Sequence, residues 1–368
     1  MSEHSLIDRF RGRFEGPNTI GNSRGFWVGF AVALAVAFAY PIFVSNYQAG
    51  NLALFLIYAI LALSLSVVWG YSGVLSFGQV VFFGFAGYTF GIVTLNIQST
   101  VGIMMAIPIA VGVATLVAFT LGYFMFYGKV TGVFVAIITL VSTIVLQTFM
   151  AQTAGSEWAI GKAQLGGFNG MPGIPNIALG VGETSVAFSG KLFYWLCLVL
   201  LVLSYFGLRA LTNGRFGYAM VGVREDEDRV EMLGYDIRKV KLTVFTVGGA
   251  IAGLAGVLYA AWGNYIDPTV FSLTFATFPV IWVTVGGRES LLGAVLATVS
   301  LEWFRQQLAI TGSEYALVVV GLLLLVVVLV LPDGIVPYVH EKAVSAYREY
   351  NDEVDRSVGS STEEEIPE

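Results

Sequence analysis

About ten apolar runs recur along the chain, each with the roughly 17 to 25 residues that a helix needs to cross a bilayer core. Hydrophobic residues make up 56% of the 368 residues, and charged residues only 12%. A globule in water could not bury so much apolar surface, so lipid is the expected solvent. The sequence therefore predicts an all-α integral membrane protein with about ten transmembrane helices. The predicted spans cover residues 26–45, 51–69, 77–95, 102–127, 132–150, 191–211, 242–262, 271–285, 291–308 and 315–331.

The charge of the loops predicts the topology independently of hydropathy, because cytoplasmic loops of membrane proteins collect Lys and Arg. Residues 1–25 carry four arginines, and the loop 212–241 carries six basic residues. The loops 46–50 and 96–101 carry no charge and are expected outside. We therefore predict a multi-pass protein of the plasma (inner) membrane with both termini in the cytoplasm.

This model divides the chain into three parts. Residues 1–25 are a basic cytoplasmic leader, residues 26–336 are a transmembrane domain, and residues 337–368 are an acidic cytoplasmic tail. Within the domain, residues 151–190 form an outside loop, and residues 212–241 form a cytoplasmic loop.

Two features of the spans favour a transporter architecture. Five spans on each side of the outside loop would give inverted repeats, a plan common in transporters. The spans 77–95 and 271–285 are short or rich in glycine, so we expect re-entrant or broken helices there.

Charges of both signs are interleaved in the cytoplasmic segment 223–236. A short helix from Glu225 to Leu233, ended by Gly234, fits this pattern. Such a helix could dock onto a soluble partner. Charge runs more often form a solvated connector between helices, so both interpretations stay open at this point.

The segment 70–88 places small and polar residues inside an apolar span. Glycines there allow helices to pack closely, or allow a helix to break at membrane depth and expose backbone groups to a solute. Gln79 carries an amide that needs a partner in another helix, in water or in a solute. Hydrogen bonding to another helix is the favoured prediction for it.

Glu302 and Arg305 are a charged pair in the predicted span 291–308. They lie three residues apart on one helical face, so we expect them to neutralise each other rather than to relay protons. The outside segment 166–175 is rich in Gly and Pro and predicts a folded, turn-rich surface.

Signatures of catalysis and of metal binding are absent from the sequence. There is no GxxxxGK[ST] phosphate loop, so the chain does not hydrolyse ATP by that route. His4 and His340 lie near the two ends, and Cys197 is the single cysteine. We therefore expect no catalytic residue, no metal and no cofactor in this chain.

Five segments together resemble the permeases of ABC importers for branched-chain amino acids, urea and short amides. They are WGYSGVLSFGQVVFFGFAGY (69–88), VREDEDRVEMLGYD (223–236), AGLAGVLYA (252–260), IDP (266–268) and IWVTVGGRESLLGA (281–294). The chain looks most similar to the second permease subunit, and to the urea-type branch in particular. It departs from many relatives at Gln79, Leu165 and Glu289.

The resemblance implies a complex with a related permease subunit, two ATP-binding subunits and an extracytoplasmic solute-binding protein, set in membrane lipid and without nucleic acid. It implies that the segment 76–88 contributes to the translocation pathway and that the segment 224–235 couples the permease to the ATPase. The implied pathway residues are Ser76, Gln79, Phe82, Phe83 and Tyr88. The implied coupling residues are Arg224, Glu225, Asp226, Glu227, Arg229, Leu233, Gly234 and Tyr235.

The solute and the class of transporter leave alternatives. A permease for a small polar solute, urea first, is the main hypothesis, and a branched-chain amino acid importer is the alternative. A self-sufficient secondary transporter or channel would be expected to carry buried charges for ion coupling, and the spans are nearly free of charge. An intramembrane enzyme would need paired catalytic groups, and no such pair is evident.

Overall fold

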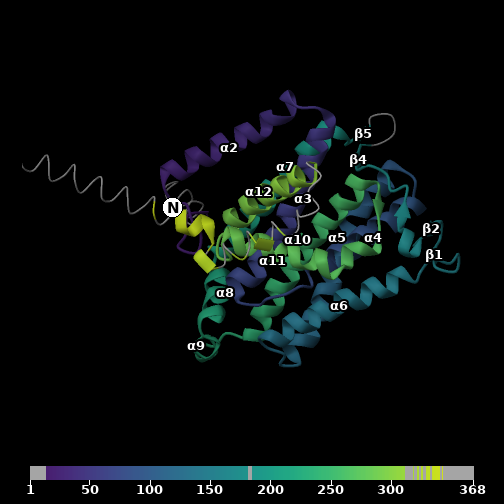
Figure 1. Cartoon of the computed structure of the whole chain (residues 1–368). Helices are drawn as coiled ribbons and strands as arrows, with labels where there is room; N and C mark the ends of the chain where they lie inside the picture. The colour runs from purple at the N-terminus through teal and green to yellow at the C-terminus, as the bar shows by residue number, and fades with distance from the viewer. Residues whose placement is uncertain are drawn as a thin grey trace, which may run out of the picture.

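The computed structural model describes residues 14–180 and 185–310, with residues 318, 321–322, 325, 329–331, 334–339 and 342. The first part of the basic leader, most of the predicted span 315–331 and nearly all of the acidic tail lie outside the described residues. The described chain is a bundle of helices with small antiparallel strand pairs (Figure 1).

Within the described residues, seven helices are long and apolar enough to cross a membrane. Two further helices, α11 (Leu273–Gly286) and α12 (Leu291–Ile310), meet that criterion only as a pair, bent by 117°. This confirms the predicted all-α membrane fold, and the bent pair agrees with the expectation of a broken or re-entrant span at 271–285. The other span with that expectation, 77–95, is instead a continuous helix, Gln79–Asn96. The long helices are α2 (Arg24–Phe43), α3 (Asn46–Leu65, continued by the π-helical turn Ser66–Gly70), α4 (Gln79–Asn96), α5 (Thr100–Tyr127), α6 (Val133–Ala151), α7 (Gly190–Thr212) and α10 (Ile237–Gly263).

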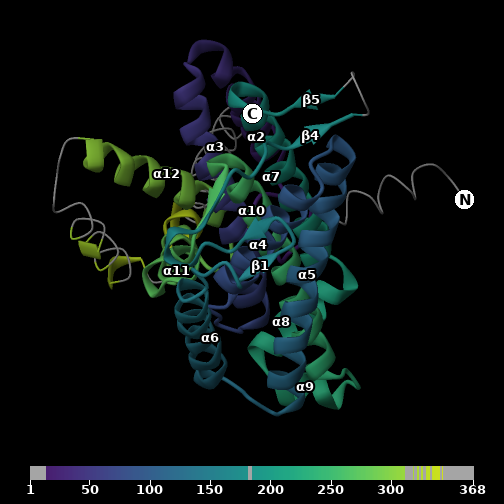
Figure 2. The same ribbon diagram turned by 90° about the vertical axis from the view of Figure 1, so that its right-hand side faces the viewer.

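The two ends of the bundle differ in character (Figure 2). The helices α8 (Arg215–Glu225) and α9 (Glu227–Met232) lie at one end. Strands of the segment between α6 and α7 also pair with each other. The strands β4 (Ala178–Leu179) and β5 (Val186–Ala187) pair toward the other end, and β1 (Ala159–Ile160) and β2 (Ala163–Gln164) pair near mid-height in this view. This long loop is therefore folded, as its Gly and Pro content predicts.

The connection from α10 to α11 turns back into the bundle. Its strand β6 (Tyr265–Ile266) pairs with β3 (Met171–Pro172) of the long loop, with Met171 opposite Ile266. A 3₁₀ turn, Pro268–Phe271, follows and leads into α11. Phe271 stacks on Tyr88 of α4, with 6.0 Å between the ring centroids. The outer loop is thus joined to α4 and α11 through this connection.

The two halves repeat one order of elements in opposite directions. In each half a long helix, α3 or α10, is followed by a non-helical segment, a shorter helix and a further helix. The long helices run antiparallel, since Trp262 near the end of α10 donates its indole N–H to Gly50 O near the start of α3 (2.8 Å). The long helix of each half packs on the following helices of the other half. Thus α10 packs on α4 and α5, and α3 packs on α11 and α12. This arrangement agrees with the inverted-repeat prediction.

Small residues let α10 pack at the centre of the bundle. Gly253 and Ala114 face each other across α10 and α5, and a Cβ at Gly256 would collide with the Phe83 carbonyl of α4. Lipid provides little hydrophobic drive for helices to associate, so close backbone contact of this kind contributes much of the packing energy in membranes.

Replacing Gly256 by Ala should therefore destabilise the bundle by about 1–3 kcal/mol, since the added methyl group forces α10 and α4 apart. Thermal unfolding of the purified protein in detergent measures this effect. Gly112→Ala on α5 is the matched control, because a Cβ there meets no atom within 4 Å. Equal melting temperatures for the two variants would contradict the packing argument.

The sidedness of the bundle is a separate prediction. Asp228 and Ser185 are exposed, and Cys197 is buried. In a Cys197→Ala background, Asp228→Cys should react with an impermeant maleimide only from the cytoplasmic side, and Ser185→Cys only from outside. Right-side-out and inverted vesicles separate the two cases. Labelling of both positions from one side would overturn the topology.

Candidate functional site

The helices α8 and α9, with the residues that follow up to Tyr235, form a bend that we call the elbow. Two local features of the sequence produce it. Asp226 has extended backbone angles (φ −161°, ψ 100°) that end α8, and its carboxylate accepts the N–H of Arg229 as the N-cap of α9 (3.1 Å). Gly234 has φ +85° just after α9. The predicted helix from Glu225 to Leu233 is thus present as Glu227–Met232, and Glu225 belongs to α8. The difference arises because Asp226 interrupts the helical run.

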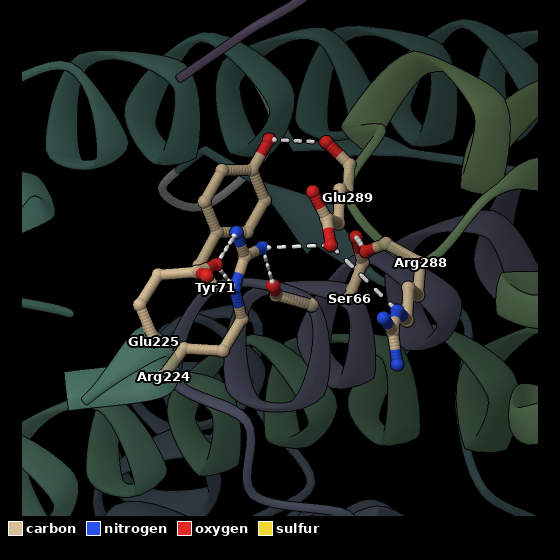
Figure 3. A network of polar contacts seen from close by, with 7 residues as sticks. Ser66, Tyr71, Arg224, Glu225, Arg288 and Glu289 are labelled. Carbon is tan, nitrogen blue, oxygen red and sulfur yellow. Dashed lines mark hydrogen bonds and ion pairs between the residues drawn. The ribbon is translucent and has the colours of Figure 1, made fainter. Parts of the chain in front are cut away.

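Arg224, the penultimate residue of α8, connects three parts of the fold (Figure 3). Its Nη1 donates to the carbonyl of Gly70 at 2.7 Å and forms an ion pair with Glu289 Oε1 at 3.1 Å. Its Nη2 pairs with Glu225 Oε1 at 2.6 Å. The Arg224 side chain is only 17% exposed. The end of α3, the elbow and the turn between α11 and α12 are therefore held by one guanidinium group.

The end of α3 and the turn 287–290 also contact each other directly. The Ser66 hydroxyl donates to Arg288 O (3.4 Å), and the Tyr71 hydroxyl donates to Glu289 O (3.1 Å) (Figure 3). A Cβ at Gly70 would collide with the Arg288 carbonyl oxygen, so only glycine allows this approach. The π-helical turn Ser66–Gly70 lies at this contact, and such turns are frequent at functional sites.

A second ion pair fixes the elbow to α10. Lys241 Nζ lies 2.6 Å from Glu227 Oε1, and the Lys241 side chain is nearly buried. Asp236 caps the first turn of α10, where the N–H of Lys239 donates to its carboxylate and holds its pKa below the usual range. A polar hollow of about 640 Å³ lies between this elbow and the α5–α6 connection.

The tip of the elbow exposes apolar side chains. Leu233 is 76% exposed and Tyr235 is 49% exposed, and Met232 beside them is also exposed. Arg229 pairs only locally, with Asp226 (2.8 Å). Of the predicted coupling residues, Arg224 and Glu227 thus anchor the elbow, while Leu233 and Tyr235 face outward.

The predicted pathway residues lie inside the bundle. Ser76, Gln79, Phe82, Phe83 and Tyr88 are all buried. The Gln79 Oε1 accepts the Ser64 hydroxyl of α3 at 3.2 Å, which is the predicted bond to another helix, and its Nε2 is buried without a partner. The Tyr88 hydroxyl is likewise buried without a partner. The chain enters α4 through a non-helical stretch that starts at the exposed Gly73 and becomes buried at Val74, Ser76 and Gly78.

The aromatic residues of this group, on α4 of the first half, contact helices of the second half. Phe82 packs edge-on against Phe245 of α10, with 5.4 Å between the ring centroids. Phe83 contacts Tyr259 of α10 (5.1 Å) and Phe275 of α11 (5.4 Å). Movement of α10 or α11 would therefore be transmitted to α4 through these ring contacts.

Sequence reasoning missed the role of Arg209. This buried residue near the end of α7 donates to the backbone carbonyls of Phe14 (2.6 Å), Ile20 (3.1 Å) and Gly21 (2.7 Å). It thereby fixes the end of the basic leader beside the Arg224 network, and a hollow of about 680 Å³ lies between them. An Arg near the end of a span is an ordinary positive-inside signal, so the pattern alone gave no hint of this clamp.

Within the described residues, no cluster of three or more His, Cys, Asp and Glu side chains could hold a metal ion. Cys197 is buried, and its thiol is a packing group of α7.

The Arg224–Glu289 ion pair should stabilise the fold by joining elements that are distant in sequence. In a double-mutant cycle with Arg224→Gln and Glu289→Gln, we expect a coupling of about 1 kcal/mol in unfolding free energy, because the arginine is largely buried. The local, more exposed pair Arg229–Asp226 is the control and should give less than about 0.5 kcal/mol. A coupling near zero for the first pair would contradict its bridging role.

Comparisons with known proteins match most of the chain. A family model described as branched-chain amino acid transport system / permease component matches residues 47–328. LivM of Escherichia coli K12, a high-affinity branched-chain amino acid transport system permease protein, is 32% identical over 84% of this chain and 74% of its own length. A probable LivM of Methanocaldococcus jannaschii is 27% identical over 76% of this chain and 90% of its own.

A more distant relative is the ribose import permease protein RbsC of Escherichia coli K12, 28% identical over 66% of this chain and 79% of its own length. No solved structure matches the chain. The family model covers α3 to α12, which includes the elbow and the Arg224 network. The chain therefore belongs to the family of permease components of branched-chain amino acid transport systems, and it is a permease of the ABC importer type.

Proposed function

We propose that this chain is the translocating subunit of an ATP-driven importer of branched-chain amino acids. Its LivM relatives are branched-chain amino acid permeases, which supports this solute over urea, the first hypothesis from the sequence. The complex would contain a related permease subunit, two ATP-binding subunits and an extracytoplasmic binding protein. The elbow of α8 and α9 would face the cytoplasm, as the basic loops predict.

The observation that carries the mechanism is the pairing of an exposed apolar tip with a largely buried arginine on one elbow. Leu233 and Tyr235 suit a groove on an ATP-binding subunit, because interface energy concentrates in such anchors. Arg224, on the same elbow, donates a hydrogen bond to the end of α3 and forms an ion pair with the turn before α12. A displacement of the tip would therefore be transmitted to both inverted halves where the end of α3 meets the turn before α12.

The steps follow from these contacts. ATP binding brings the partner subunits together and displaces the elbow. The displacement shifts the end of α3 in one half and the 287–290 turn in the other, and α4 and α11 follow because they pack on those elements. The protein has two states that the partner biases. The unpartnered Gln79 Nε2 and Tyr88 hydroxyl on α4 would be available to a solute when these helices separate.

A secondary transporter or channel is the competing class, and it differs in its energy source. In vesicles, the permease pair without ATP-binding subunits should not concentrate leucine. Concentrative uptake by the pair alone would exclude the importer mechanism.

The coupling role is tested by replacing Leu233 and Tyr235 with Ala together. Both side chains are exposed, so abundance and melting temperature should stay near wild type. Solute uptake should fall at least about tenfold, and ATPase activity should lose its dependence on loaded binding protein, because the elbow is the proposed route between solute and motor. The matched control is Met105→Ala with Ile109→Ala, two exposed apolar residues of α5.

Normal uptake by the Leu233/Tyr235 double variant at normal abundance would overturn the coupling role. The elbow would then be the solvated connector that a charge run more often forms.

A further inference from the structure

A carboxylate lies in the interior of the membrane domain, far from the elbow. Glu302 is the twelfth residue of α12, about 16 Å along the helix from Leu291. Its side chain is only 2% exposed. A charged side chain at such depth is costly and rare, and within spans it marks a solute or ion pathway by default.

Glu302 is held by two partners from two helices. Arg305, one turn further on α12, contributes its Nη2 at 2.6 Å and its Nε at 3.0 Å, both to Oε2. Trp282 of α11 donates its indole N–H to Oε1 at 3.2 Å. The predicted neutralisation of Glu302 by Arg305 is thus confirmed.

Stability alone is a weak reason for this pair. Replacing a buried ion pair by apolar residues of similar volume is often neutral or stabilising, because desolvation offsets the attraction. A pair of opposite charges does offer one thing that apolar residues cannot. Each of the two side chains can release its protein partner and bind the opposite charge of a zwitterion. No buried charge is then left unpaired.

The pair is accessible from one side and lies beside an aromatic wall. Arg305 remains 36% exposed, and its guanidinium lies over Phe278 of α11, 5.5 Å from the ring centroid. Phe278 contacts Trp282 in turn (5.9 Å). Thr274 and Thr277 lie on the same face of α11 and are not buried. This polar and aromatic surface suits a solute path better than plain lipid contact.

We infer that Glu302 and Arg305 form the site for the ammonium and carboxylate groups of the transported amino acid. The ammonium group binds Glu302, the carboxylate binds the Arg305 fork, and the aliphatic side chain lies against Phe278 and its neighbours. The two protein charges close on each other when no solute is bound, as the structure has them. This inference rests on the proposed function and names the residues that would recognise its solute.

The position on α12 connects recognition to the coupling network. Glu289 lies in the turn that leads into α12 and is paired with Arg224. A shift of that turn would move α12 relative to α11, which holds Glu302 through Trp282. The Glu302–Arg305 pair would then open when ATP binding displaces the elbow. A neutral solute such as urea could replace neither ion, so the pair would select against it.

The test uses the full complex in proteoliposomes, with ATP and leucine-loaded binding protein. The double variant Glu302→Gln with Arg305→Gln removes both charges together, and its two amides can still bond to each other and to Trp282. Leucine transported per ATP hydrolysed should fall at least tenfold, while ATPase stimulated by the binding protein stays within twofold. Gln306→Ala on the same helix is the control and should change neither value.

A second variant keeps the ion pair and therefore the fold. Arg305→Lys retains the charge but lacks the planar fork, so leucine transported per ATP should fall at least threefold. A wild-type ratio in either variant would overturn the inference. Parallel loss of stimulated ATPase and thermal stability in Arg305→Lys would also overturn it, because the pair would then be structural. Wild-type complex that carries urea and not leucine would instead refute the proposed function.

Discussion

The carbonyl of Gly70 lies where α3 ends, so no further turn of that helix can supply it with an N–H group. Arg224 supplies the donor from α8 and binds Glu289 before α12 with the same guanidinium nitrogen. Since α3 and the α11–α12 pair belong to opposite halves of the inverted arrangement, this one side chain fixes the halves relative to each other. The position of the elbow and of its outward tip depends on that junction.

The sequence was sufficient for the features that arise from local physics. Long apolar runs placed α2 to α7 and α10 within a few residues, and loop glycines predicted the folded outer segment. The end of α9 near Gly234 was also predicted, because the left-handed backbone there favours glycine. Asp226 was read as one charge among many, although an Asp before a helical run also predicts an N-cap. That signal would have divided α8 from α9.

The contacts that build the candidate site were beyond the sequence. Arg224 meets Gly70 across 154 positions, and Ser66 meets Arg288 across 222. Each of these residues has an adequate local explanation, since a glycine packs helices and an arginine marks the inside. Only the pairing of α3 with the α11–α12 turn shows that they act together. The same holds for Arg209, whose partners in the leader are backbone carbonyls that carry no residue-type signal.

Charge within the bundle follows a consistent rule. Near the elbow, Arg224 and Lys241 are nearly buried and each pairs with a carboxylate on another element. Deeper in, Glu302 and Arg305 pair within α12 itself, and Trp282 and Phe278 of α11 contact them. A cross-element pair resists the separation of its elements, whereas a pair within one helix can open without moving the helix. The first kind therefore suits transmission of force, and the second suits a site that must repeatedly release its solute.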